Sequence, residues 1–181
     1  MNRLSTLLRP APQIPRLPGD LPAALLVVQH MPPMFTKSLA NRLNELSNIR
    51  VKEAESGDHI ETGLALLAPG NFHMEVKMGD RIAMNQKPPI WGVRPSVDVT
   101  MLSASLIYGA ATVGVILTGM GCDGTNGSAS VKAGGGKILA QDEATCVVYG
   151  MPRSVVESGN ADKVVPLQEM AAEIVKYVGA R

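Results

Sequence analysis

The chain has 181 residues, a formal net charge of +1 and 45% hydrophobic residues, which suits a folded domain large enough to bury a core. Charged residues are scattered along the sequence, and aromatic residues make up only 3%. Such a chain lacks the basic stripe and the stacking side chains typical of nucleic-acid-binding proteins, so we expect no nucleic-acid partner. Its apolar runs are too short to span a bilayer, and direct membrane insertion is not expected either.

The two cysteines, Cys122 and Cys146, have no Cys-x-x-Cys spacing, and no secretory signal precedes them. A reduced, cytoplasmic protein is therefore predicted. The three histidines, His30, His59 and His73, have no i,i+4 pairing and no acidic cluster around them in the sequence. We expect neither a metal site nor a bound cofactor.

Hydrophobic periodicity predicts strands that alternate with helices. Leu4, Leu7 and Leu8 share a helical face, which predicts a short helix at the start, and five prolines within residues 9–22 predict an extended connector after it. Strands are predicted at residues 23–28, 64–68, 111–117, 137–140 and 163–165. Helices are predicted at residues 35–46, 96–107 and 127–133, after Pro152, and at residues 167–178.

Residues 73–76 and 81–84 flank a Met-Gly-Asp turn, which predicts a β-hairpin at an edge of the sheet. Strands that alternate with helices favour right-handed crossovers between parallel strands. The predicted fold class is α/β, with a doubly wound, mainly parallel sheet, helices on both faces and an antiparallel edge hairpin. We find no internal repeat, and residues 1–181 are expected to form a single domain.

Two polar side chains follow predicted buried strands. His30 comes two residues after the strand at 23–28, and Asp123 follows the strand at 111–117. In an open α/β sheet the ligand lies beyond the carboxyl ends of the strands, where both side chains would meet. An imidazole that acts as a base needs a carboxylate to orient it. The alternatives are an ordinary loop histidine and an aspartate that caps the following helix.

A second class of function also has a match. Residues 119–124 read GMGCDG, which fits the G-x-G-x-x-G pattern of dinucleotide-binding proteins, and Asp142 and Glu143 lie about twenty residues further on. Against this interpretation, Asp123 would put a negative charge where a pyrophosphate binds, and the motif comes late in the chain.

Five strings in order resemble the catalytic domain of the chemotaxis protein-glutamate methylesterases, the CheB family. They are VVQHMP at 27–32, RPSVD at 94–98, LTGMG at 117–121 with DG at 123–124, AQDE at 140–143 and GMPR at 150–153. The resemblance implies hydrolysis of glutamate γ-methyl esters, and deamidation of particular glutamines, on the cytoplasmic helices of methylated chemoreceptors. By the same resemblance His30 is the general base, Asp123 its orienting carboxylate, and Met120 part of the loop that lines the oxyanion site.

One part of the family pattern is missing. The family carries its nucleophilic serine in a Gly-x-Ser-Thr-Gly-Gly-Pro turn after a first strand, whereas this chain begins MNRLSTLL. Ser5 copies the serine of that turn but falls within the leucine pattern, without the strained turn that presents a nucleophile. We therefore expect a domain that is incomplete at its N-terminus, without a receiver domain, and of doubtful activity as written. The alternative is an inactive module that docks on receptors.

Overall fold

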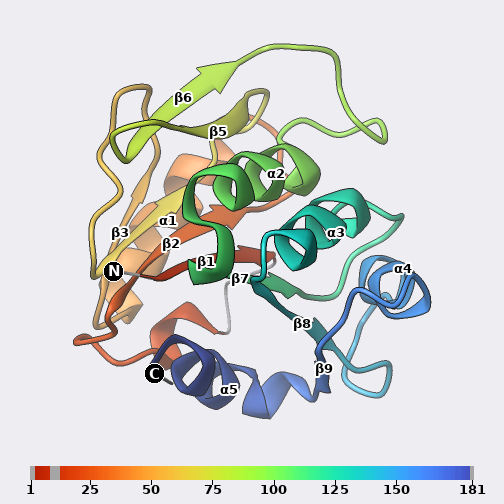
Figure 1. The fold of residues 1–181 in the computed structure, drawn as a ribbon. Coiled ribbons are helices and arrows are strands. Elements are labelled where there is room, and N and C mark those ends of the chain that lie inside the picture. The colour runs from red at the N-terminus through yellow and green to blue at the C-terminus, as the bar shows by residue number, and fades with distance from the viewer. Residues whose placement is uncertain (1–2, 9–12, 180–181) are drawn as a thin grey trace.

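A computed structural model describes residues 3–8 and 13–179, with side chains from Gln13 onward. Its centre is a seven-stranded sheet in the order β3-β4-β2-β1-β7-β8-β9, and every neighbouring pair is parallel (Figure 1). These strands are β1 (Arg3–Leu8), β2 (Ala23–Val28), β3 (Arg50–Glu53), β4 (Leu64–Leu67), β7 (Thr112–Ile116), β8 (Lys137–Gln141) and β9 (Lys163–Val165). A separate antiparallel sheet consists of β5 (His73–Lys77) and β6 (Arg81–Asn85).

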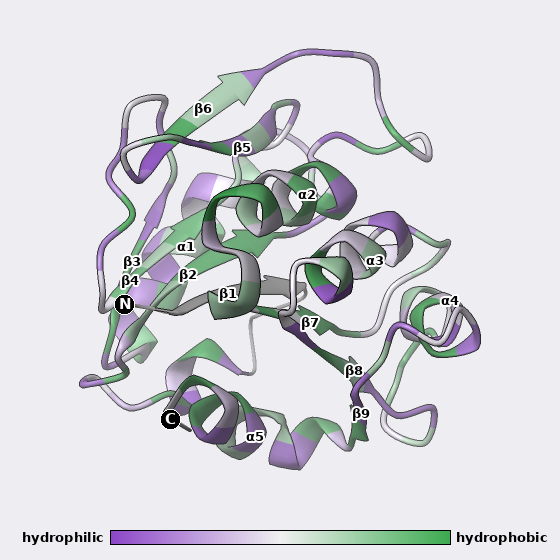
Figure 2. Ribbon diagram, in the orientation of Figure 1, coloured by the Kyte–Doolittle hydropathy of each residue, from purple (hydrophilic) through white to green (hydrophobic). Residues whose placement is uncertain are grey.

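Helices cover the sheet on both sides, which confirms the predicted α/β class. The helices are α1 (Phe35–Leu46), α2 (Val97–Tyr108), α3 (Thr125–Ala133), α4 (Met151–Glu157) and α5 (Leu167–Gly179), with 3-10 turns η1 (Ile14–Arg16) and η2 (Gly109–Ala111). Figure 1 shows α2 and α3 side by side over one face and α5 on the other. The core lies between these layers, and β2, strongly hydrophobic in Figure 2, is buried along its whole length.

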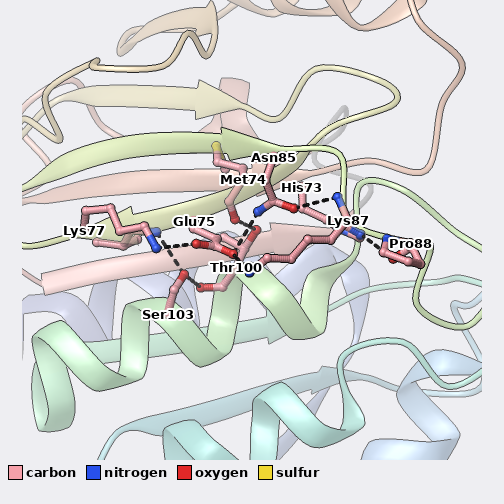
Figure 3. A network of polar contacts seen from close by, with 10 residues as sticks. His73, Met74, Glu75, Lys77, Asn85, Lys87, Pro88, Thr100 and Ser103 are labelled. Atoms are coloured by element: carbon pink, nitrogen blue, oxygen red, sulfur yellow. Dashed lines mark hydrogen bonds and ion pairs between the residues drawn. The ribbon is translucent and has the colours of Figure 1, made fainter.

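The predicted antiparallel hairpin is present and forms a sheet of its own that packs on α2. The Thr100 hydroxyl donates to the Met74 carbonyl at 2.7 Å, and the Val76 amide donates to the Ser103 hydroxyl at 2.9 Å. Figure 3 shows this seam between the hairpin and the helix. Side chains of α2 therefore satisfy backbone groups of the hairpin that the main sheet does not pair.

The prediction of a helix near the start of the chain is wrong. Residues 3–8 form β1, which pairs with β2 on one side and β7 on the other. Both neighbouring strands are buried, so without β1 their inward N–H and C=O groups would lack partners. A short run of leucines fits either period, and the vacant position in the sheet decides between them.

Two further elements differ from the sequence prediction. The proline-rich connector contains the 3-10 turn η1, in which Pro15 occupies the first turn, a position that proline tolerates. Edge strand β3 was missed because three of its four residues are polar and its sides are only partly buried. The predicted helix after Pro152, for which no end was given, is α4, which begins one residue before that proline. The remaining helices and strands begin and end within two residues of their predicted limits. No helix in the described ranges is long and apolar enough to cross a membrane.

Gly127 lets α2 and α3 approach closely, because a Cβ there would lie 2.7 Å from the Cβ of Met101 and 3.2 Å from the Cα of Asp98. We expect Gly127→Ala to lower the free energy of unfolding by about 1–3 kcal/mol through overpacking, as measured by urea denaturation. Gly179→Ala is the matched control, since nothing lies within 4 Å of that position. Equal stabilities of the two variants would contradict the close packing.

Candidate active site

His30 and Asp123 meet at the carboxyl edge of the sheet. His30 lies two residues beyond β2, and Asp123 lies in the loop between β7 and α3. The Nε2 atom of His30 is 2.8 Å from Oδ2 of Asp123. The carboxylate is 2% exposed and the imidazole 24% exposed, so the histidine has one side toward solvent while its partner is buried. An imidazole held in this way has a defined orientation and a stabilised protonated form.

The Asp123 carboxylate is bound at the N-terminus of α2. The backbone N–H of Val97 donates to Oδ2 at 2.7 Å, that of Asp98 donates to Oδ1 at 3.0 Å, and the Ser96 hydroxyl donates to Oδ1 at 2.7 Å. Ser96 occupies the N-cap position of α2, but its hydroxyl bonds to Asp123 rather than to its own helix. Asp123 therefore caps α2 instead of the helix that follows it in the sequence.

These contacts decide the charge of Asp123. Burial acts to raise the pKa of this carboxyl, while the hydrogen bond from His30 and those from Val97, Asp98 and Ser96 act to lower it. The hydrogen bonds prevail, and the pKa lies below its usual range. The residue is thus ionised at neutral pH, as the partner of a protonated imidazole must be.

A second carboxylate makes the reciprocal contact. Oδ1 of Asp98, in the first turn of α2, accepts from the N–H groups of Gly124 at 3.0 Å and Gly127 at 2.7 Å, at the start of α3. Its Oδ2 accepts from the indole N–H of Trp91 at 2.8 Å. Burial raises the pKa of Asp98, and the nearby charge of Asp123 adds to this rise. Asp98 of α2 therefore caps α3, while Asp123, in the loop before α3, caps α2.

His73 supports this arrangement from the hairpin. Its Nδ1 accepts from the Ser96 backbone N–H at 3.2 Å, and its Nε2 lies 3.2 Å from the carbonyl of Pro88 (Figure 3). These partners assign the neutral tautomer with the proton on Nε2. Because Ser96 contacts both His73 and Asp123, the hairpin helps to fix the residue that orients the carboxylate.

Met120, which the family resemblance assigns to the loop of the oxyanion site, lines a cavity together with His30. The cavity has a volume of about 240 Å³ and is lined by Gln29, His30, Val93, Thr118, Gly119, Met120 and Met151. Met120 is 83% exposed. Its backbone N–H donates to no residue in the described part of the chain. The residue thus combines a solvent-facing side chain with an available donor next to the imidazole.

The loop that carries Met120 is held rigidly. The backbone N–H of Gly119 donates to Val148, and its carbonyl accepts from the N–H groups of Gly150 and Met151. A Cβ at Gly119 would lie 2.4 Å from the sulfur of Met151, so a larger residue there would displace the buried Met151 side chain. Donors fixed before the reaction begins are what stabilisation of an oxyanion requires.

Ser5 is not brought to this site. Its backbone lies within β1, in register with Leu25 of β2 and Val113 of β7. The strand continues for three more residues to Leu8, so Ser5 is roughly 10 Å short of the carboxyl edge at 3.3 Å per residue.

Sequence reasoning missed three supporting residues: the roles of Asp98, His73 and the Ser96 hydroxyl. Ser96 and Asp98 both belong to the string RPSVD at 94–98, which carries two polar residues directly before and within an apolar helix. The contrast between these two polar residues and the apolar helix was a signal from which a role for them in the site could have been predicted. The contact of His73 depends on the packing of the hairpin against α2, which no local pattern indicates.

A parallel α/β sheet whose carboxyl edge holds an imidazole oriented by a buried carboxylate is typical of hydrolases that act on esters and amides. Residues 12–174 match the CheB methylesterase family. The chain belongs to this family, which confirms the resemblance found in its sequence.

Similar proteins agree with this assignment. A protein-glutamate methylesterase/protein-glutamine glutaminase from Symbiobacterium thermophilum is 56% identical over 92% of this chain and 46% of its own length. One from Pyrococcus horikoshii is 49% identical over 91% of the chain and 45% of its own length. The chain spans about half the length of these curated relatives. The crystal structure of the Thermotoga maritima CheB methylesterase catalytic domain matches 98% of this chain and 100% of that one, with 42% identity and a TM-score of 0.93.

The charge of Asp123 leads to a prediction about stability and pH. In Asp123→Asn the amide NH2 replaces one of the two carboxylate oxygens and faces the backbone N–H of Val97 or of Asp98, so a buried donor loses its acceptor in either orientation. We expect the variant to be less stable than the parent by about 1–3 kcal/mol at pH 7. A lowered folded-state pKa gives stability that is present above the usual carboxyl pKa of about 4 and is lost as pH falls through the folded value. The difference between parent and variant should therefore shrink toward pH 3.

Urea denaturation of both proteins between pH 7 and pH 3 measures this difference. Asp20→Asn is the control, because Asp20 is exposed, and a change within about 0.5 kcal/mol is expected there. A difference for Asp123→Asn that stays constant over the whole range would mean that Asp123 has the same pKa in the folded and unfolded protein, which would contradict a lowered pKa in the fold.

Proposed function

We propose that this chain hydrolyses glutamate γ-methyl esters, and deamidates glutamines, on the cytoplasmic helices of chemoreceptors. The observation that carries the proposal is the 2.8 Å contact between Nε2 of His30 and the buried Asp123 carboxylate at the carboxyl edge of the sheet. Membership of the CheB methylesterase family supports the reaction class. The relatives that share 56% and 49% identity are named for both activities.

The proton would move through Nδ1 of His30. Nε2 is engaged by Asp123, and Nδ1 has no hydrogen-bond partner among residues 13–179. In the familiar serine hydrolase template the carboxylate binds Nδ1 and Nε2 serves the nucleophile. Here the two nitrogens exchange these roles. Nδ1 would accept the proton of the attacking oxygen and return it to the departing methanol or ammonia, while Asp123 stabilises the imidazolium between these steps.

The backbone N–H of Met120 would stabilise the oxyanion. It lines the same cavity as His30 and is held by the contacts of Gly119 with residues 148–151. Removal of one such donor typically costs about 10²–10³ in kcat. Met120 would therefore act through its main chain, and its exposed side chain would contact the substrate.

The end of β1 and the residues that follow it in the sequence supply no nucleophilic side chain for this mechanism. β1 ends at Leu8, in register with Val28 and close to the edge where His30 lies. The next four residues in the sequence are Arg, Pro, Ala and Pro, which carry neither a hydroxyl nor a thiol. A serine hydrolase that lacks one triad member accelerates the reaction only about 10³–10⁴-fold over the rate in water.

This observation favours a second candidate function, a module that docks on receptors without turnover. Such a module would bind the receptor in the cavities around His30 without forming an acyl-enzyme. A dinucleotide site has less support, because the N–H groups of Gly124 and Gly127 at the start of α3 already donate to Asp98. A pyrophosphate would have to displace that carboxylate.

Methanol release from a methyl-esterified receptor fragment tests the proposal. We expect slow turnover by the parent chain, with a water molecule activated by His30 as the attacking group, and a loss of about 10²-fold or more in His30→Ala. His59→Ala is the matched control, because that histidine is exposed and its backbone bridges to Arg81 of the hairpin. Ser5→Ala should also keep the parental rate, since Ser5 lies within β1.

The outcomes separate the two candidates. Turnover that needs His30 and tolerates the loss of Ser5 supports the esterase. Absence of turnover in the parent, together with saturable binding of the receptor fragment, contradicts catalysis by this chain and supports the docking module. Loss of turnover in Ser5→Ala would mean that β1 moves to deliver a nucleophile.

A further inference from the structure

Arg94 stands beside His30 in a second cavity. This cavity has a volume of about 330 Å³ and is lined by His30, Met31, Pro32, Pro33, Asn71, Gly92, Val93 and Arg94. No aspartate or glutamate is among these lining residues, and Arg94 is the one permanently charged group. The lining of this cavity therefore carries one permanent positive charge and no carboxylate.

The guanidinium of Arg94 is held entirely by uncharged acceptors. Its Nη1 donates to the carbonyls of Gln86 at 2.8 Å and Lys87 at 2.9 Å, and its Nη2 donates to Oδ1 of Asn71 at 2.6 Å. Within the described ranges no carboxylate oxygen lies within 4.0 Å of it, and its buried Nε has no partner. The charge is positioned but not neutralised, which is the state of an arginine that awaits an anion.

Hydrogen bonds and close packing fix the position of Arg94. Asn71 donates its backbone N–H to the Arg94 carbonyl, so the two residues bind each other in both directions. A Cβ at Gly70 would lie 2.5 Å from the nitrogen of Pro33, so this loop packs directly against the segment that follows His30. The cation therefore sits at a fixed place relative to the imidazole.

We propose that Arg94 makes this cavity a subsite for a carboxylate of the receptor segment. The contacts above use three of the five guanidinium N–H groups, so the Nε N–H and one Nη2 N–H remain as a pair of the kind with which a guanidinium recognises a carboxylate. The carboxylate has two possible sources: the glutamate that hydrolysis creates, and an acidic residue that neighbours the reacting side chain on the same segment. The inference rests on the proposed function, and it deepens that function by stating which charge the substrate carries.

The fluorescence of the single tryptophan, Trp91, can be used to measure binding in this cavity. Trp91 is 56% exposed and adjoins Gly92 at the rim of the cavity, so its fluorescence should respond to an occupant. Three peptides of one receptor sequence serve as probes. The first carries an unhydrolysable methyl ketone in place of the ester, with neutral neighbours. The second has glutamate at that position, and the third combines the ketone with a glutamate four residues away.

Whichever peptide places its carboxylate at Arg94 should bind more tightly than the neutral ketone peptide. We expect Arg94→Gln to remove that advantage, about tenfold in affinity or about 1.4 kcal/mol, and to leave the neutral peptide unchanged. Arg94→Lys, which keeps the charge without the paired donors, should retain part of it. Arg42→Gln, an exposed position on α1, is the matched control.

The carboxylate advantage should also decrease as salt is raised, a readout that needs no variant and so remains available if Arg94→Gln does not fold. Equal binding of all three peptides by the parent, or an advantage that persists in Arg94→Gln, would overturn the subsite while leaving the proposed function standing. Binding of none of the peptides, with glutarate still quenching Trp91 in an Arg94-dependent way, would instead count against the receptor substrate and retain the carboxylate site.

Discussion

The carboxylate of Asp123 is almost fully buried, and an ion in that position is stable only while its oxygens meet hydrogen-bond donors. Four donors do so: the imidazole of His30, the Ser96 hydroxyl and two backbone N–H groups of α2. This one group therefore links the loop after β2, the start of α2 and the loop after β7. A displacement of any of these segments would leave a charge without compensation, which is why the geometry around His30 is so closely determined.

The exchange of carboxylates between α2 and α3 extends this constraint. Asp123 precedes α3 but caps α2, whereas Asp98 belongs to α2 and caps α3. Burial acts to raise the pKa of both groups, but their net shifts are opposite: the pKa of Asp123 is lowered and that of Asp98 is raised. One reason is that Asp123 has an imidazole as partner, while Asp98 feels the charge of Asp123. Asp123 therefore stays ionised and orients His30, whereas Asp98 connects α2 to the start of α3.

The segment from Gly92 to Ser96 contains both Arg94, the proposed carboxylate-binding residue, and Ser96, which binds Asp123. Arg94 lines the cavity on one side of His30, and two residues later Ser96 holds the carboxylate that orients the same imidazole. The hairpin supports this segment through His73, which accepts from the Ser96 backbone. Residues that a substrate would touch and residues that set the base therefore share one short stretch of chain, anchored from two directions.

Much of this architecture could be read from the sequence. The apolar run at 23–28 determined β2 to the residue, because a buried parallel strand needs hydrophobic side chains on both faces. The order of elements determined that His30 and Asp123 reach the same edge. Only the tertiary structure decided that residues 3–8 are a strand, because the vacant position between β2 and β7 outweighs a local pattern that fits either period. It also decided which helix Asp123 caps: sequence shows that an aspartate precedes a helix, but the N–H groups that it faces depend on how two helices pack.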